Sequence, residues 1–222
     1  MIFHDDDIMY PNMLSELYNS IIENTKNIAV GANAAINING KTIKKYLINI
    51  SQENIILDSK EKVVYRYLNE DNVPLSSFLY KRDVAIKLHF NILYGGKYCD
   101  FPFIMDVSTL GNIIYLAKPL MVYFYHKGQD SGTNDFLAKI KLINHITKTT
   151  KYNRKDPLAK KFRLQNIHYE LKNRMINGDI VVFSNRYFKI LKLIFRTIFI
   201  KQLAKFLLLS LMIFLNFNHQ KK

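Results

Sequence analysis

The sequence predicts an α/β protein with an all-helical last third, and three observations carry this prediction. In the first ~130 residues, runs of β-branched residues alternate with segments of helical periodicity, as in helices packed on a sheet. The dipeptide Asn39-Gly40 ends a run rich in β-branched residues and is a strong hairpin signal. After the polar stretch HKGQDSGTN three helical stretches follow one another. We therefore expect one domain over residues 1–133, with a boundary near Thr133, and a helical region over residues 134–222.

Local signals predict the elements of the first half. MIFH at the N-terminus resembles the end of a strand, because it is apolar and then abruptly acidic. Residues 11–25 are expected to form a helix with Pro11 in its first turn. Its apolar face would hold Met13, Leu14, Leu17, Ile21 and Ile22. Residues 27–40 carry β-branched residues and end in the hairpin signal Asn39-Gly40, and a short helix over residues 59–71 should follow.

The second half of the α/β region is predicted in the same way. Residues 73–80 are typical of a strand, and residues 81–97 of a helix ended by Gly95-Gly96. The next helix should begin near Asp100, with Pro102 in its first turn. Residues 113–126 are expected to form two short strands broken around Lys118-Pro119, because proline cannot donate to a strand ladder.

Charge and cysteine content limit the classes of function. The 32 Lys and Arg outnumber the 18 Asp and Glu, which gives a net charge of +14. Residues 1–58 are nearly balanced, whereas residues 139–222 are dense in Lys and Arg. This asymmetry predicts an anionic partner, either nucleic acid or a membrane surface. The single cysteine, Cys99, excludes an internal disulfide framework and a cysteine-rich zinc site, and the MIFHDDD start does not have the pattern of a signal peptide.

The acidic triplet Asp5, Asp6 and Asp7 permits two interpretations. Adjacent carboxylates repel one another, so the triplet is either a solvated acidic turn ahead of a helix or a cation site. In an extended segment alternate side chains point the same way, so Asp5 and Asp7 could share a metal ion while Asp6 faces a ligand. Mg²⁺ uses one or two carboxylates and completes its shell with water and phosphates, which suits this pattern.

Two further groups could carry chemistry. Asp100 follows Gly95-Gly96 and precedes an apolar helix, so it is either a helix N-cap or a general base presented by a helix start. Asp106, six residues on, is expected to be a surface or structural carboxylate. The loop after the last predicted strand holds polar donors that either are solvated or grip a diphosphate, namely His126, Lys127, Gln129 and Ser131.

The order of these groups is more specific than any one of them. HDDD after a strand end, then GGKYCD at a helix start, then KPLMVYFYHKGQDS resembles the second half of a family 2 glycosyltransferase over residues 2–131. The resemblance implies a GT-A nucleotide-sugar-binding domain with a mixed sheet. It also implies an inverting, metal-dependent transfer of a sugar from a nucleotide-sugar donor to a glycan or lipid-linked acceptor.

The resemblance assigns roles residue by residue. Asp5, Asp6 and Asp7 fall on the Asp-x-Asp motif, where Asp5 and Asp7 would hold Mn²⁺ or Mg²⁺ and Asp6 would face the sugar-nucleotide diphosphate. Asp100 falls on the catalytic base that deprotonates the acceptor hydroxyl. His126 and Gln129 fall in the closing segment, near the diphosphate.

The sequence also departs from the family. The βαβ units that hold the base and ribose would precede the Asp-x-Asp strand, and no glycine-rich nucleotide turn stands elsewhere. We therefore expect the C-terminal part of a glycosyltransferase, truncated or completed by a separate N-terminal polypeptide. Whether the chain is active alone stays open at this point.

The C-terminal segment predicts a location. Residues 187–217 are apolar but interrupted by Lys and Arg, and the run FLLLSLMIFLNF is shorter than the ~20 residues that span a bilayer. The segment is therefore expected to be an interfacial helix, or a helix packed on the domain or a partner. Together with the resemblance, this favours a peripheral protein at the cytoplasmic face of a membrane.

Two other functions stay open from the sequence alone. The charge, and tyrosines between lysines in residues 151–174, would suit a non-catalytic basic module that binds nucleic acid. No nucleic-acid-binding motif supports that function, so nucleic acid is not the favoured partner. The chain could also be an assembly subunit that completes its sheet with a separate chain.

Overall fold

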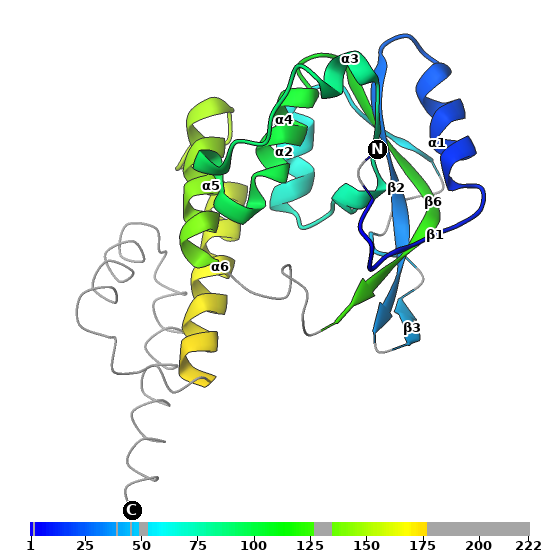
Figure 1. The fold of residues 1–222 in the computed structure, drawn as a ribbon. Coiled ribbons are helices and arrows are strands. Elements are labelled where there is room, and N and C mark those ends of the chain that lie inside the picture. The colour runs from blue at the N-terminus through cyan, green and yellow to red at the C-terminus, as the bar shows by residue number, and fades with distance from the viewer. Residues whose placement is uncertain (2, 39, 45, 49–52, 127–134, 177–222) are drawn as a thin grey trace, which may run out of the picture. The chain divides into compact units, whose positions relative to one another are not determined.

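The computed structural model describes residues 1, 3–38, 40–44, 46–48, 53–126 and 135–176 (Figure 1). The chain divides into two compact units, of which the first spans Met1–Ala159 and the second begins at Lys160. The predicted boundary near Thr133, and the predicted interfacial helix over residues 187–217, lie outside the described residues.

The first unit is built on two long parallel strands, β2 (Asn27–Ile38) and β6 (Asn112–Tyr125). Short antiparallel strands extend this pair on both sides (Figure 1). On β6 these are β1 (Ile8–Met9) and β4 (Ile55–Leu57), and on β2 they are β3 (Lys41–Lys44) and β5 (Leu79–Tyr80). The mixed sheet with helices confirms the predicted α/β class.

The predicted hairpin is present between β2 and β3. Ile38 lies opposite Lys41, which leaves Asn39-Gly40 as a two-residue connection. Gly40 has a φ of +83°, in the left-handed region that tight hairpin turns require and that glycine adopts without strain. The hairpin could be predicted because its geometry depends on these two residues alone.

The predicted break around Lys118-Pro119 is wrong. β6 is one strand, but its register against β2 shifts, because Ala32 pairs with Leu116 and the next residue, Asn33, pairs with Pro119. The two extra residues, Ala117 and Lys118, form a bulge, and pairing resumes at Pro119 without ending the strand. The fully buried Asn33 side chain donates to a carbonyl oxygen of the displaced segment at 3.2 Å, so the bulge is internally satisfied.

Three predicted helices of the first half are confirmed. They are α1 (Met13–Ile22), α2 (Lys60–Leu68) and α4 (Asp100–Val107). α1 packs on β2 and buries Met13, Leu17 and Ile21 in a core cluster with residues of both long strands. Leu14 and Ile22, which were expected on the same face, are exposed. The buried stripe of α1 is therefore narrower than its sequence pattern predicts.

The predicted helix over residues 81–97 is wrong. Only a single turn, α3 (Arg82–Ala85), and two 3₁₀ turns, η2 (Ile92–Tyr94) and η3 (Gly96–Tyr98), form there. The side chain of Asn91 accepts a hydrogen bond from the Leu93 N–H, which starts a new turn where a continuous helix would continue. The conformation of this region is therefore determined by local side-chain hydrogen bonds and not by the helical periodicity of its apolar residues.

The predicted strand over residues 73–80 is confirmed only at its end, as β5. Before it, η1 (Leu75–Ser77) forms a 3₁₀ turn. The Ser77 hydroxyl donates to the carbonyl oxygen of Pro74 at 2.7 Å and accepts from the N–H of Ala32 at 3.0 Å. The Ser77 side chain therefore accepts the hydrogen bond of the Ala32 N–H in β2, in the place where a longer β5 would have supplied a backbone acceptor.

The last described elements are helices, as predicted. α5 (Phe136–Thr149) starts at Asp135, whose side chain accepts from the Ala138 N–H at 2.9 Å. α5 belongs to the first compact unit, and α6 (Pro157–Ile176) begins in the first unit and continues into the second. Among the described residues, none of the helices combines the length and the apolar character needed to cross a bilayer.

Candidate functional site

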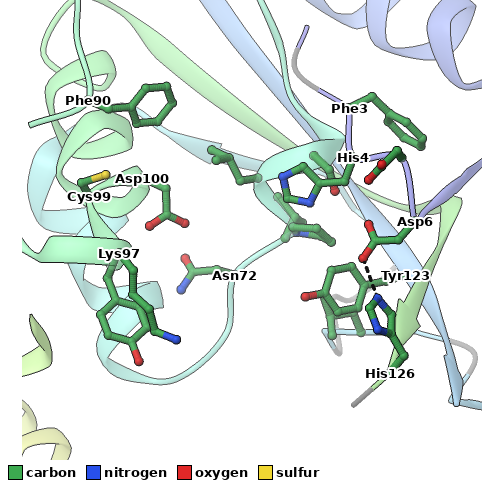
Figure 2. Close-up of a pocket in the computed structure, with 17 residues that line it drawn as sticks. Phe3, His4, Asp6, Asn72, Phe90, Lys97, Cys99, Asp100, Tyr123 and His126 are labelled. Carbon is green, nitrogen blue, oxygen red and sulfur yellow. Dashed lines mark hydrogen bonds and ion pairs between the residues drawn. The ribbon is translucent and has the colours of Figure 1, made fainter. Parts of the chain in front are cut away.

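A cavity of about 910 Å³ lies in the first unit and is lined by four separate stretches of chain (Figure 2). These stretches are residues 3–6, residues 72–76, residues 97–100 and the region of Tyr123 and His126 around the end of β6, and Leu47 and Phe90 add single side chains. The lining residues are therefore far apart in the sequence, from Phe3 to His126, but contribute to one surface. Asp5, Asp6, Asp100 and His126, all predicted site residues, line it.

The acidic triplet does not have the extended conformation that we expected. Phe3 and His4 are not in a strand, residues 5–7 form a turn, and β1 follows the triplet. The Asp7 N–H reaches back to the carbonyl oxygen of His4 at 3.4 Å. Because the chain turns here, the side chains do not alternate, and the reason for pairing Asp5 with Asp7 no longer holds.

Asp7 is buried and bonded from two sides. Its Oδ2 accepts from the hydroxyl of the fully buried Ser76 at 2.8 Å, and its Oδ1 accepts from the backbone N–H of Phe124 at 3.2 Å. Burial raises the pKa of Asp7, and these two hydrogen bonds oppose that rise. Asp7 thereby ties the acidic turn to η1 and to the end of β6.

Asp6 lies on the cavity side of the turn. Its Oδ2 is 3.0 Å from Nε2 of His126, directly after β6 (Figure 2). The Asp6 side chain is 31% exposed and that of His126 is 47% exposed, so both remain open to a ligand. The structure thus joins two predicted diphosphate-binding residues that are 120 positions apart.

A candidate metal group forms around the turn. Ligand atoms of His4, Asp6 and Asp7 all lie within 4.8 Å of one another. Two carboxylates with open positions suit Mn²⁺ or Mg²⁺, and each Asp7 oxygen keeps a second lone pair beyond its hydrogen bond. These residues could hold a divalent ion, in which case His4 would take the place that the sequence pattern gave to Asp5. The sequence signal that could have marked His4 as a candidate ligand is its position directly before the acidic triplet.

Asp100 lies on the opposite wall (Figure 2). It is the first residue of α4, and Cys99 occupies the N-cap position, so the N-cap interpretation of Asp100 is wrong. Burial raises the pKa of Asp100, while hydrogen bonding from the Phe101 N–H and the charge of His4 oppose the rise. Asp106 is a surface carboxylate that pairs with Lys60 at 3.3 Å, as expected.

Two lining residues lie between the walls and were not predicted as site residues. Figure 2 shows the His4 ring between Asp100 and Asp6, and the Asn72 side chain pointing into the space below Asp100. Asn72 also accepts a hydrogen bond from the Tyr115 hydroxyl at 3.4 Å. No sequence signal marks Asn72, because its place depends on the loop between α2 and η1. Gln129, the remaining predicted site residue, lies outside the described residues, as do Lys127 and Ser131.

The arrangement offers two carboxylate centres facing one cavity. One centre has three potential metal ligands and a histidine on its rim, and the other has a single half-buried carboxylate at a helix start. No family model matches the chain, and no curated protein matches it at a significant level. The function must therefore be argued from the cavity itself.

Proposed function

We propose that this chain provides the catalytic site of a nucleotide-sugar glycosyltransferase of the family 2 type, built on a GT-A fold. The observation that carries the proposal is the position of Asp100 across one cavity from Asp5, Asp6 and His126. The resemblance to the family predicted that the acidic turn and Asp100 would face a common substrate. Had the acidic side chains pointed away from the cavity that contains Asp100, the proposal would have failed.

The turn side of the cavity would bind the donor. His4, Asp6 and Asp7 would hold Mn²⁺ or Mg²⁺, which when bound neutralises negative charge on the diphosphate. His126, close to Asp6, would donate a hydrogen bond to a phosphate oxygen when protonated. This region carries the polar groups that a sugar-nucleotide diphosphate requires.

The Asp100 side would activate the acceptor. Asp100 would take the proton of an acceptor hydroxyl as that oxygen bonds to the anomeric carbon, while the bond from this carbon to the diphosphate breaks. Attack from the face opposite the leaving group inverts the anomeric configuration. The burial-raised pKa of Asp100 moves it toward neutral pH, where a carboxylate is a better base. One carboxylate suffices here, unlike the pair needed for glycoside hydrolysis.

The acceptor is a glycan or a lipid-linked sugar, and the protein acts as a peripheral protein at the cytoplasmic face of a membrane. The net charge of +14 supports attraction to anionic lipid.

Calorimetric titration of nucleotide sugars, with and without Mn²⁺, tests the proposal. We expect binding that depends on Mn²⁺ and falls at least about tenfold in Asp6→Ala, since second-sphere and ligand losses of this kind cost roughly ten- to a hundredfold. Asp58→Ala is the matched control, because Asp58 is an exposed carboxylate in a different part of the unit, paired with Lys62 at 2.7 Å. Equal binding by wild type and Asp6→Ala would reject the donor site.

A further inference from the structure

The segment of residues 86–94, between α3 and η3, exposes an unusual amount of apolar side chain. Ile86 is 66% exposed, Ile92 68% and Leu93 75%, and the rings of Phe90 and Tyr94 are 41% and 39% exposed. Single exposed apolar residues need no explanation, but five large ones within one segment of nine residues indicate an interaction surface. We call residues 86–94 the apolar loop.

The apolar loop is held in place by its two rings. Phe90 stacks on Phe103 of α4 with ring centroids 4.5 Å apart, and Tyr94 stacks on His145 of α5 at 4.1 Å. These contacts fix the loop against helices of the same unit, so its aliphatic side chains are presented outward from a defined base. The exposure of Ile92 and Leu93 therefore follows from the way in which the two rings hold the loop.

Basic side chains flank the aliphatic ones. Arg82 and Lys87 are exposed, and neither forms an ion pair with any residue in the described ranges. Lys81 donates to the carbonyl oxygen of Thr25 at 2.8 Å. Asp83 is the single acidic residue between positions 81 and 97. The loop therefore combines exposed aliphatic groups with net positive charge.

We propose that the apolar loop inserts into the interfacial region of an anionic lipid bilayer. Aliphatic side chains that enter the acyl boundary, with Lys and Arg at the level of the anionic headgroups, are the pattern that binds such an interface. A second copy of the chain is a poorer occupant, because it would bring the same basic residues together in a protein of net charge +14.

The contact does not depend on the proposed function, but its position bears on it. Phe90 belongs to the apolar loop and also lines the cavity, on the Asp100 wall (Figure 2). A bilayer bound at this loop would lie beside the wall that activates the acceptor. If the proposed function is correct, the acceptor is therefore a lipid-anchored one whose sugar enters along this rim.

A probe at a single position tests the contact independently of any other membrane-binding part of the chain. Cys99 is the single cysteine, so a Cys99→Ser background allows Leu93→Cys to be labelled with an environment-sensitive fluorophore. Leu14→Cys, on the exposed side of α1, is the matched control because Leu14 is 51% exposed. Vesicles of phosphatidylcholine with phosphatidylglycerol should shift the Leu93 probe to the blue and leave the Leu14 probe unchanged. Lipid-attached quenchers should quench the Leu93 probe alone.

A second measurement uses unlabelled full-length chain. We expect Ile92→Ser with Leu93→Ser to lower the partition coefficient onto anionic vesicles about tenfold, because each apolar side chain removed from the interface weakens binding substantially. Leu14→Ser with Ile22→Ser removes the same side-chain types from α1, where both are exposed, and should leave partitioning unchanged.

Three results would overturn the proposal. The first is an unshifted Leu93 probe on chain that sediments with the vesicles, and the second is failure of the chain to sediment with them at all. The third is a blue shift that grows with protein concentration without vesicles, which would assign the loop to self-association. None of these measurements involves nucleotide sugars, so the membrane contact and the proposed function fail separately.

Discussion

The two walls of the cavity are built in different ways. The acidic turn is fixed by side-chain bonds to distant elements, through Asp6 to His126 and through Asp7 to Ser76 and Phe124. Asp100 is instead positioned by the start of α4, after the turn η3 that follows the apolar loop. A rigid, multiply bonded wall suits charge binding, and a lone half-buried carboxylate suits proton transfer. Substitutions at each wall test whether charge binding and proton transfer are separated in this way.

The largest effect is expected from Asp100→Asn. If Asp100 is the proposed general base, its loss should lower turnover by roughly 10²- to 10⁴-fold. Nucleotide-sugar affinity should stay within about twofold, because the donor is proposed to bind at the other wall. Nucleotide diphosphate release measures turnover, and calorimetry measures affinity. Asp106→Asn is the control on the same helix, since Asp106 pairs with Lys60 at the surface. If Asp100→Asn keeps the turnover of the wild type, Asp100 is not the general base.

The next largest effect is expected on Mn²⁺ affinity, which should distinguish Asp6 from Asp5 in the acidic turn. Mn²⁺ affinity, measured by electron paramagnetic resonance of the free ion, should fall roughly ten- to a hundredfold in Asp6→Asn. Asp5→Asn should change it by less than about threefold, because Asp5 lines the cavity outside the group of ligands within 4.8 Å. The extended-strand pattern predicts the reverse for Asp5, so a large loss in Asp5→Asn would restore that interpretation.

Stability should distinguish Asp7 from its neighbours. Asp7→Ala leaves the Phe124 N–H and the Ser76 hydroxyl without their acceptor in a buried place, which costs roughly 1–3 kcal/mol of unfolding free energy per group. Urea denaturation followed by circular dichroism measures this cost. Asp5→Ala, at an exposed position in the same turn, should stay within about 0.5 kcal/mol. Equal effects of the two substitutions would mean that Asp7 does not anchor the turn.

The smallest effect concerns pH. Because burial raises the pKa of Asp100 above its usual 3.8, the folded protein binds that proton more tightly than the unfolded chain. This carboxyl therefore makes folding less favourable as pH rises through the folded-state pKa. Asp100→Asn should therefore gain stability relative to wild type as pH rises above 3.8. A difference in urea midpoint that stays constant with pH would contradict the raised pKa.

Local sequence signals predicted the elements whose geometry is decided within a few residues. The Asn39-Gly40 turn, the amphipathic α1 and the start of α4 were all predicted correctly. The same method failed at residues 81–97, where side-chain bonds from Asn91 and the Gly95-Gly96 pair replace a helix with short turns. Val84 is buried there, but Ile86, Ile92 and Leu93 are exposed, so the apolar periodicity did not predict burial.

The sequence by itself determined which chemical groups are available: the acidic triplet beside His4, a carboxylate at a helix start, and a histidine after the last strand. Only the tertiary structure decided that Asp5, Asp6, Asp100 and His126 share one cavity and that Asp7 is a buried anchor. Turns and caps depend on neighbouring residues, whereas this cavity depends on the parallel pairing of β2 with β6 and on a bond between Asp7 and Phe124, which are 117 residues apart. Contacts at that separation leave no local pattern in the chain.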